Sequence, residues 1–309
     1  MIRRGTAAVS FAIVFLSAGQ EVAGQAGAPA AAAAAKPTRG SLLQADQALS
    51  ASARAKGIAA AFGEILAPNS LFLYDGAPIV AGRENILTLL GAQPLLATMR
   101  IQWIPMVAVI SSDGTFGATY GVTAISRLPI QEDSAISFGK YISTWRWSAA
   151  GAWQLLGHVE MGLPGAEAVI PPGIASRAPN ASDLSSGTGA PFTRADIDFA
   201  NMAAASGAPA AFGVFAAPDA TTLPGTGEIV IGPAAIQSRM LESSVATAKW
   251  EWHPVYSDGA GSGDLGFTVG EATIKVPNST DEYHSKYLTL WRRQPDGSIR
   301  FIVDGGNSR

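Results

Sequence analysis

The sequence predicts an α+β protein with two tandem cone-shaped domains, each with N-terminal helices packed on a strongly curved antiparallel sheet. Three observations lead to this fold class. The chain contains two similar halves, each half begins with an Ala-rich helical stretch, and each half ends in four strand-like runs. Hydrophobic residues make up 48% of the chain and charged residues 15%, which is typical of folded domains with filled cores.

The two halves align with each other in long segments. Residues 45–86 match residues 195–236 without a gap, and the stretch GKYISTWR at 139–146 matches SKYLTLWR at 285–292. These units are longer than the roughly 20–45 residues of a solenoid repeat, so we interpret each half as a domain. Positions identical in both halves include Asp46/Asp196, Gly117/Gly266, Gly121/Gly270, Lys140/Lys286, Tyr141/Tyr287 and Trp145/Trp291.

The predicted elements follow the same order in each half. An Ala-rich helix is expected over 42–62 and 195–215, and Pro68 and Pro218 end it because proline lacks an amide donor. Two short extended pieces joined by a turn and a short helix come next. Four longer strands are then expected at 100–110, 116–128, 136–147 and 153–160, and in the second half at 249–256, 265–276, 283–293 and 299–304.

The N-terminal residues are predicted to be a secretory signal, which implies a periplasmic or secreted protein. Arg3 and Arg4 precede an apolar stretch at 6–18, and the small residues Gly24 and Ala26 follow on either side of Gln25. The apolar stretch is too short to cross a bilayer comfortably, although an uncleaved anchor is the alternative. The predicted boundaries are 1–26 for the signal, 27–40 for an Ala/Pro-rich linker, 41–162 for the first domain, 163–191 for a second linker and 192–309 for the second domain.

Composition excludes several classes of function. Cysteine is absent, which excludes thiol catalysis and Cys-based metal sites. The net charge of -3 argues against a nucleic-acid or anionic-membrane surface, so we expect neither partner once the signal is cleaved. The three His residues form no metal-ligand spacing and no phosphate-binding loop occurs, so no metal and no cofactor are expected.

The order of elements and several short phrases resemble the nuclear transport factor 2-like superfamily, which includes SnoaL-like and ketosteroid-isomerase-like domains. The phrases are similar to those of a bacterial subgroup of unknown function. It is carried by Ala67-Pro68-Asn69, Trp103, Pro105, Gly139-Lys140-Tyr141 and Trp145-Arg146, and in the second half by Ala217-Pro218-Asp219, Trp252, Pro254, Lys286-Tyr287 and Trp291-Arg292. The resemblance implies a cone-shaped fold with a pocket, and pairing of the two domains through their sheets. A homo-oligomer is also compatible with the resemblance.

The repeated strand should present two different faces, because side chains alternate along a strand. Tyr141, Ser143 and Trp145 share one face, which we expect to line the pocket. The alternative is that Tyr and Trp only fill the core. Lys140 and Arg146 share the other face, from which they should reach solvent, unless this face joins the two domains.

The candidate site residues fall into two groups. The predicted ligand-binding residues are Trp103, Tyr141, Trp145, Trp252, Tyr287, Trp291 and Asp304. The predicted catalytic residues are His158, Glu160 and Tyr120, because a His and a carboxylate two residues apart share a strand face and suit acid/base chemistry.

Three functions are compatible with these patterns. The leading hypothesis is an exported protein that binds a small apolar or aromatic ligand, or acts as a scaffold. The second is an isomerase, cyclase or hydrolase that uses acid/base residues of the first domain. The third is a protein-interaction module that uses the outer sheet faces.

Overall fold

The computed structural model describes residues 37–129, 136–163, 168–174, 187–280 and 282–309. The predicted signal lies outside these residues. Residues Ala35–Arg309 form one compact unit. In the part of the chain that is described, no helix is both long and apolar enough to cross a membrane.

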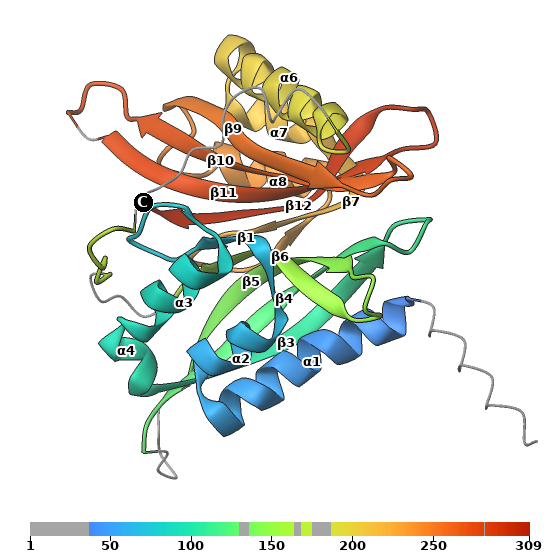
Figure 1. The fold of residues 1–309 in the computed structure, drawn as a ribbon. Helices are drawn as coiled ribbons and strands as arrows, with labels where there is room; N and C mark the ends of the chain where they lie inside the picture. Colours follow the sequence, from blue (N-terminus) through green and yellow to red (C-terminus); the bar gives the residue numbers. More distant parts are fainter. Residues whose placement is uncertain (1–36, 130–135, 164–167, 175–186, 281) are drawn as a thin grey trace, which may run out of the picture. The chain divides into compact units, whose positions relative to one another are not determined.

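Each half consists of helices followed by strands, as predicted (Figure 1). The first half contains α1 (Arg39–Lys56), α2 (Ile58–Ile65), β1 (Leu66–Leu73), β2 (Val80–Ala81), α3 (Arg83–Gly91), α4 (Pro94–Ala97), β3 (Met99–Ile110), β4 (Phe116–Arg127), β5 (Ile136–Trp147) and β6 (Trp153–Met161). The second half contains α6 (Ala190–Ser206), α7 (Ala208–Phe215), β7 (Ala216–Leu223), β8 (Val230–Ile231), α8 (Pro233–Leu241), β9 (Lys249–Gly259), β10 (Leu265–Lys275), β11 (Glu282–Arg293) and β12 (Ile299–Ser308).

The Ala-rich stretch of each half forms two helices instead of the single one predicted. Gly57 and Gly207 separate them, with φ of 90° and 85°, a backbone conformation that side chains other than glycine rarely adopt. At its N-terminus α1 is capped by Thr38, whose hydroxyl accepts from the Ser41 amide at 3.0 Å. The chain therefore turns between two helices that pack on each other.

Each half holds one six-stranded sheet, in the orders β2-β1-β6-β5-β4-β3 and β8-β7-β12-β11-β10-β9. The four long strands form the predicted antiparallel meander. The sheets are mixed, however, because β1 pairs with β6 and β7 with β12 in parallel. This pairing places the strand that follows the helices beside the last strand of the meander, where the candidate site residues lie.

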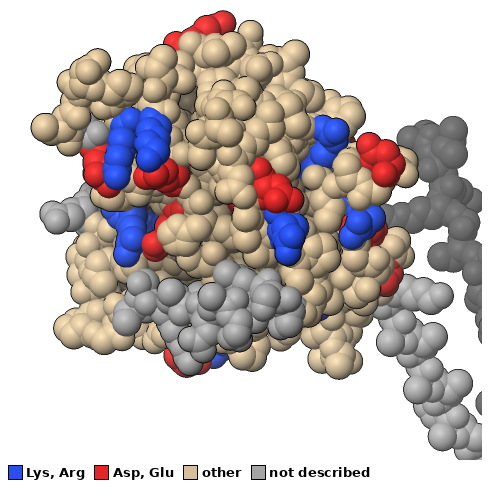
Figure 2. All heavy atoms as spheres, turned by 90° about the horizontal axis from the view of Figure 1, so that it is seen from above, with Lys and Arg blue, Asp and Glu red and all other residues tan. Residues whose placement is uncertain are grey.

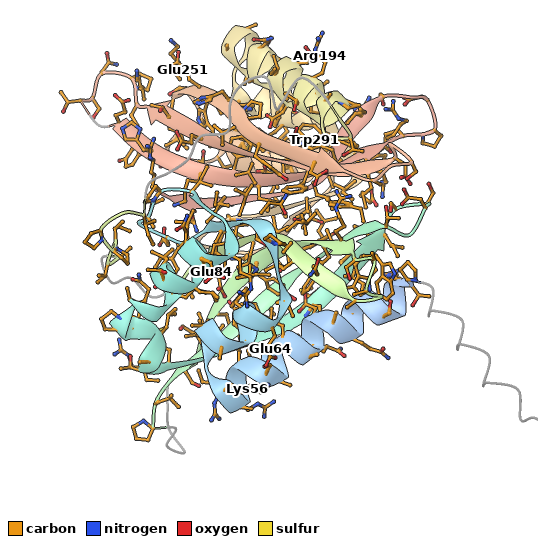
Figure 3. All side chains as sticks on the ribbon, in the orientation of Figure 1. Lys56, Glu64, Glu84, Arg194, Glu251 and Trp291 are labelled. Atoms are coloured by element: carbon orange, nitrogen blue, oxygen red, sulfur yellow. The ribbon has the colours of Figure 1, made fainter. Side chains whose placement is uncertain are left out.

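Helices cover one face of each sheet, so α1 contacts β3 and β4 while α6 contacts β9 and β10 (Figure 1). The α+β fold class is thereby confirmed. Tyr141 and Trp145 on β5 are fully buried with helix residues such as Leu42 and Phe62 in one apolar cluster. Trp291 on β11, labelled in Figure 3, lies 6.1 Å from Phe199 of α6, measured between ring centroids.

The opposite sheet faces carry contacts between the two halves. Phe116 and Phe267 stack with ring centroids 5.8 Å apart. Lys140 donates to the carbonyl of Pro224 at 2.9 Å, and Lys286 donates to the carbonyls of Tyr74 at 3.0 Å and Ala77 at 2.6 Å. Tyr74 and Pro224 are equivalent in the repeat, so these lysine contacts are reciprocal.

The expectation that Lys140 reaches solvent is wrong, because only 8% of it is exposed, and its counterpart in the repeat, Lys286, is buried as well. This side chain is 0% exposed, and its ammonium also donates to the Ser308 carbonyl. Burial lowers the pKa of Lys286 to about 8. The Lys286 ammonium donates its hydrogen bonds to backbone carbonyls. Those of Tyr74 and Ala77 belong to a turn of the other half.

Candidate functional site

The helix-facing side of the first sheet holds a cluster of buried polar groups. Asp46 projects from α1, Tyr141 and Ser143 from β5, and His158 and Glu160 from β6. All five side chains are buried. The meander brings the last two strands together so that Ser143 lies opposite His158 and Tyr141 lies opposite Glu160. We call these five residues with Trp103 of β3 the His158 cluster.

His158 is held at one ring nitrogen and is free at the other. Its Nδ1 lies 2.9 Å from the Ser143 hydroxyl, while its Nε2 lies 3.6 Å from Glu160 Oε2, which is too long for a hydrogen bond. When Nδ1 accepts from the serine, Nε2 carries the proton. The imidazole therefore presents Nε2 to Glu160 without bonding to it.

Aromatic rings surround His158. Phe72 stacks on the imidazole with centroids 5.0 Å apart, and Phe62 meets it edge-on at 5.2 Å. Tyr141 and Trp103 lie at 6.1 Å and 6.3 Å. Phe62 and Phe72 also contact each other, with centroids 5.2 Å apart, so the imidazole is enclosed by aromatic rings.

Asp46 is the carboxyl at the base of the cluster. The Tyr141 hydroxyl lies 3.1 Å from both of its oxygens. Burial raises the pKa of Asp46 to about 6, although hydrogen bonds from Thr119 and Tyr141 and the charge of nearby His158 act in the opposite direction. A carboxyl with a pKa near neutrality can exchange a proton under physiological conditions.

The second half repeats this arrangement with different chemistry at its centre. Tyr287 donates to Asp196 at 3.0 Å, as Tyr141 does to Asp46. Asp304 occupies the position of His158 and accepts from Thr289 at 2.5 Å. Burial raises the pKa of Asp196 to about 7 and that of Asp304 to about 6. Gly306 stands where the first half has Glu160, so the cluster of the second half has no counterpart of the His158–Glu160 pair.

The two clusters differ in unpaired polar atoms. Within the His158 cluster, Trp103 Nε1, His158 Nε2 and Glu160 Oε1 are buried without a hydrogen-bond partner. Elsewhere in the described residues the same holds for Thr123 Oγ1, Thr144 Oγ1 and Asn307 Oδ1. The equivalent indole nitrogen in the second half, of Trp252, donates to Asp196 at 3.0 Å. Unpaired buried polar groups are rare in native proteins and costly, and three of these six atoms lie in the His158 cluster.

The predicted ligand-binding residues lie on the helix-facing side of their sheets. Trp145 and Trp291 donate their indole N–H groups to Thr119 and Thr268 at 2.9 Å and 2.8 Å, and their rings fill the core. Trp103 and Tyr141 join the His158 cluster. Trp252, Tyr287 and Asp304 are half-buried in the second half.

Tyr120 does not join the other predicted catalytic residues. It neighbours Thr119 on β4, and since Thr119 faces the helices, Tyr120 faces the opposite way. Tyr120 is buried in the core cluster that contains Phe267 and Leu288 of the second half. Burial raises the pKa of Tyr120, while a hydrogen bond from Thr221 of the second half acts to lower it. His158 and Glu160 are therefore together, and Tyr120 lies across the sheet from them.

Asp46 and Asp196 were not among the predicted site residues. The alignment of the two halves carried their signal, because they are the acidic pair identical in both Ala-rich helices. A helix of mostly small apolar residues that keeps one carboxylate on its buried face needs polar partners for it, and Tyr141 and Tyr287 are those partners.

The second sheet carries a polar groove. A groove of about 340 Å³ on the second sheet is lined by charged and polar side chains of β9, β10 and β11, including His253, Glu271 and His284. No group of three or more acidic or His side chains in the described residues could hold a metal ion. Figure 2 shows one face of the molecule, on which Lys and Arg lie close to Asp and Glu, and most of the surface is uncharged.

No protein-family model and no curated protein matches the sequence. Several solved structures are similar in fold. A ketosteroid isomerase-like protein from Erwinia carotovora atroseptica is 11% identical and covers 38% of this chain and 91% of its own, with a TM-score of 0.32. A protein of unknown function from Shewanella oneidensis, described as like nuclear transport factor 2, is 10% identical and covers 38% of this chain and 98% of its own, also at 0.32.

A third similar structure is a domain of unknown function with a cystatin-like fold from Nostoc punctiforme. It is 13% identical and covers 42% of this chain and 79% of its own, with a TM-score of 0.34. Each of the three spans about two fifths of this chain. The first two carry names from the superfamily that the sequence resembles, and the likeness concerns the fold alone.

Proposed function

We propose that the first half binds a small organic molecule at the His158 cluster. The observation that carries this proposal is the set of three buried atoms without a partner, Trp103 Nε1, His158 Nε2 and Glu160 Oε1. Leaving a buried polar group unpaired costs about 1–3 kcal/mol. A ligand that pairs with all three would recover this free energy on binding.

The three atoms and their surroundings define the ligand's chemistry. The indole N–H of Trp103 needs an acceptor, such as a carbonyl or hydroxyl oxygen. Glu160 Oε1 needs a donor, and His158 Nε2 can serve either role according to its tautomer. The walls formed by Phe62 and Phe72 favour a flat, apolar or aromatic body. We therefore expect a small aromatic or unsaturated compound with at least one oxygen.

Native mass spectrometry of the purified full chain tests this proposal. We expect a co-purified small molecule, or stabilisation by oxygen-bearing aromatic fragments in a thermal-shift screen. His158→Gln and Glu160→Gln should each abolish the binding of the co-purified molecule or the stabilising fragment. The matched control is Asp304→Asn, which changes the equivalent position of the second half and should retain it. Retention of the ligand by both first-half variants would overturn the proposal.

A second candidate function is acid/base catalysis at the same cluster, of the isomerase, cyclase or hydrolase kind. It is favoured by Asp46, whose pKa is raised to about 6, and by its proximity to Tyr141 and His158. A general base works best when its pKa lies near the working pH. Solvent deuterium exchange into a small unsaturated ketone, followed by NMR, would detect proton transfer. We expect Asp46→Asn to abolish it, and exchange that survives this change would contradict the catalytic role.

We also propose that the chain is exported and that the two halves act as one paired unit. Residues 1–26 support export through their basic start, apolar middle and small-residue end. The reciprocal contacts of Lys140 and Lys286 support pairing. N-terminal sequencing of the protein recovered from the periplasm or medium tests export, which a mature N-terminus at Met1 would contradict.

A further inference from the structure

A short segment beyond β6, residues 168–174, lies against the first half and is fixed by one side chain. Gln93, between α3 and α4, donates from Nε2 to the Val169 carbonyl at 2.7 Å and accepts at Oε1 from the Val169 amide at 3.0 Å. The same Nε2 also donates to the Leu89 carbonyl at 2.9 Å. Gln93 is buried, while the Val169 side chain is exposed, so the two-point pairing lies at the edge of the buried interior.

Apolar contacts hold the rest of this segment. Ala168 and Ile174 pack against the core cluster that contains Trp103 and Tyr141. The Cβ of Ala168 lies 3.5 Å from where a Cβ at Gly76 would stand, which places the segment directly on the turn between β1 and β2. The Ile174 amide donates to the Pro171 carbonyl at 3.2 Å, so the segment ends in a tight turn.

The second half provides an internal comparison. Ser243 stands at the position equivalent to Gln93, and its hydroxyl donates to the nearby Met240 carbonyl at 2.7 Å. The central residue Asp304 of that half is half-buried, whereas its counterpart His158 is 0% exposed. The half with the Gln93–Val169 pairing is therefore the half whose central residue is sealed.

We propose that residues 168–174 form a strap that controls access of small molecules to the His158 cluster, with the Gln93–Val169 pairing as its latch. This proposal rests on the proposed function for the nature of the small molecule. Access to His158 can be measured without any ligand. In the closed arrangement His158 is sealed, and release of the latch frees the segment from α3 and α4.

The probe is diethyl pyrocarbonate, which modifies accessible His side chains and adds a mass that peptide mass spectrometry locates. The chain has three His residues, and His253 and His284 are exposed, so they serve as internal standards. Gln93→Ala should raise the modification rate of His158 about tenfold, because it removes two hydrogen bonds to the strap. Ser243→Ala is the matched control and should leave all three rates unchanged.

A locked variant tests the reverse direction. Gly76→Cys with Ala168→Cys places two Cβ atoms about 3.5 Å apart, within disulfide range, in a chain with no other Cys. Because Gly76 has a φ of 73°, which strains any side chain there, Gly76→Cys alone is the control for the backbone. Oxidation should lower His158 modification below that of the wild type, and reduction should restore it. An unchanged His158 rate in folded Gln93→Ala and in both redox states of the double variant would overturn the strap. Loss of ligand binding with access behaving as expected would count only against the proposed function.

Discussion

Tyr141 donates its hydroxyl to Asp46 across the sheet–helix boundary, 3.1 Å from each carboxylate oxygen. The two residues are far apart in sequence, and Tyr287 with Asp196 repeats the contact in the second half at 3.0 Å. Each contact ties the first helix of its half to the third long strand. Tyr141 and Asp46 also belong to the His158 cluster, so changes at these residues should affect both stability and the proposed function.

Removing the tyrosine hydroxyl should destabilise the protein. Tyr141→Phe leaves a buried carboxyl without one of its donors, and hydrogen bonds to charged groups contribute about 1.5–3 kcal/mol. We expect a loss of this size in the free energy of unfolding from urea denaturation. Tyr287→Phe should give a similar loss, since the contact is repeated. A loss below about 0.5 kcal/mol in both variants, typical of surface changes, would contradict the structural role of the pair.

The buried carboxyls should make stability depend on pH. The pKa of Asp196 is raised from 3.8 to about 7, so the folded protein binds this proton more tightly than the unfolded chain. The resulting stabilisation is fully present below about pH 4 and is lost as the pH rises through about 7. For Asp196 alone it amounts to about 4 kcal/mol as an order of magnitude.

Urea denaturation of the wild type and Asp196→Asn at several pH values between 4 and 8 measures this effect. Other carboxyls act in the opposite direction, since hydrogen bonds lower the pKa of Asp113. The diagnostic quantity is therefore the difference between variant and wild type, which should favour the variant increasingly as the pH rises. A difference that does not change with pH would show that Asp196 does not titrate as proposed.

The reciprocal lysines should contribute unequally. Lys286→Met would leave the carbonyls of Tyr74, Ala77 and Ser308 without their donor in a buried site, which should cost about 3 kcal/mol. Lys140→Met removes a single hydrogen bond, to the Pro224 carbonyl, and should cost about 1 kcal/mol. Thermal unfolding of both variants gives the comparison. Equal effects would mean that the buried ammonium does not hold the halves together.

Repeated glycines mark places where strands approach too closely for a side chain. A Cβ at Gly121 would lie 2.2 Å from the Ile104 carbonyl oxygen and 2.8 Å from the Met106 amide nitrogen. Both are backbone atoms of the paired strand, so Gly121→Ala should destabilise by about 1–3 kcal/mol or more. Gly91→Ala, at a helix end with open space around it, is the control and should be neutral or stabilising. Similar melting temperatures for the two variants would contradict this explanation.

The sequence predicted the fold well because the chain contains its own alignment. Identical residues in the two halves located the helices, the meander and the face of β5 that carries Tyr141 and Trp145. The parallel pairing of β1 with β6 was missed, since parallel neighbours are brought together by a long connection. Gly57 was not recognised as a helix break, because glycine within an Ala-rich stretch is compatible with helix.

The site was predicted less completely, for reasons of geometry. His158 and Glu160 share a face through simple alternation along β6. Tyr120 was assigned to the same site, but the sequence does not show which face of β4 it occupies. That face depends on the register between β4 and β5, in which Thr119 lies opposite Ser143. Burial of Lys286 depends on carbonyls more than 200 residues away in sequence, which no local pattern contains.

A high-resolution crystal structure of the purified full chain tests the central proposal most directly, through the electron density beside Trp103 Nε1, His158 Nε2 and Glu160 Oε1. We predict an organic molecule within hydrogen-bonding distance of all three atoms. Three atoms satisfied by ordered water alone, in crystals soaked with every fragment that stabilises the protein in solution, would contradict it.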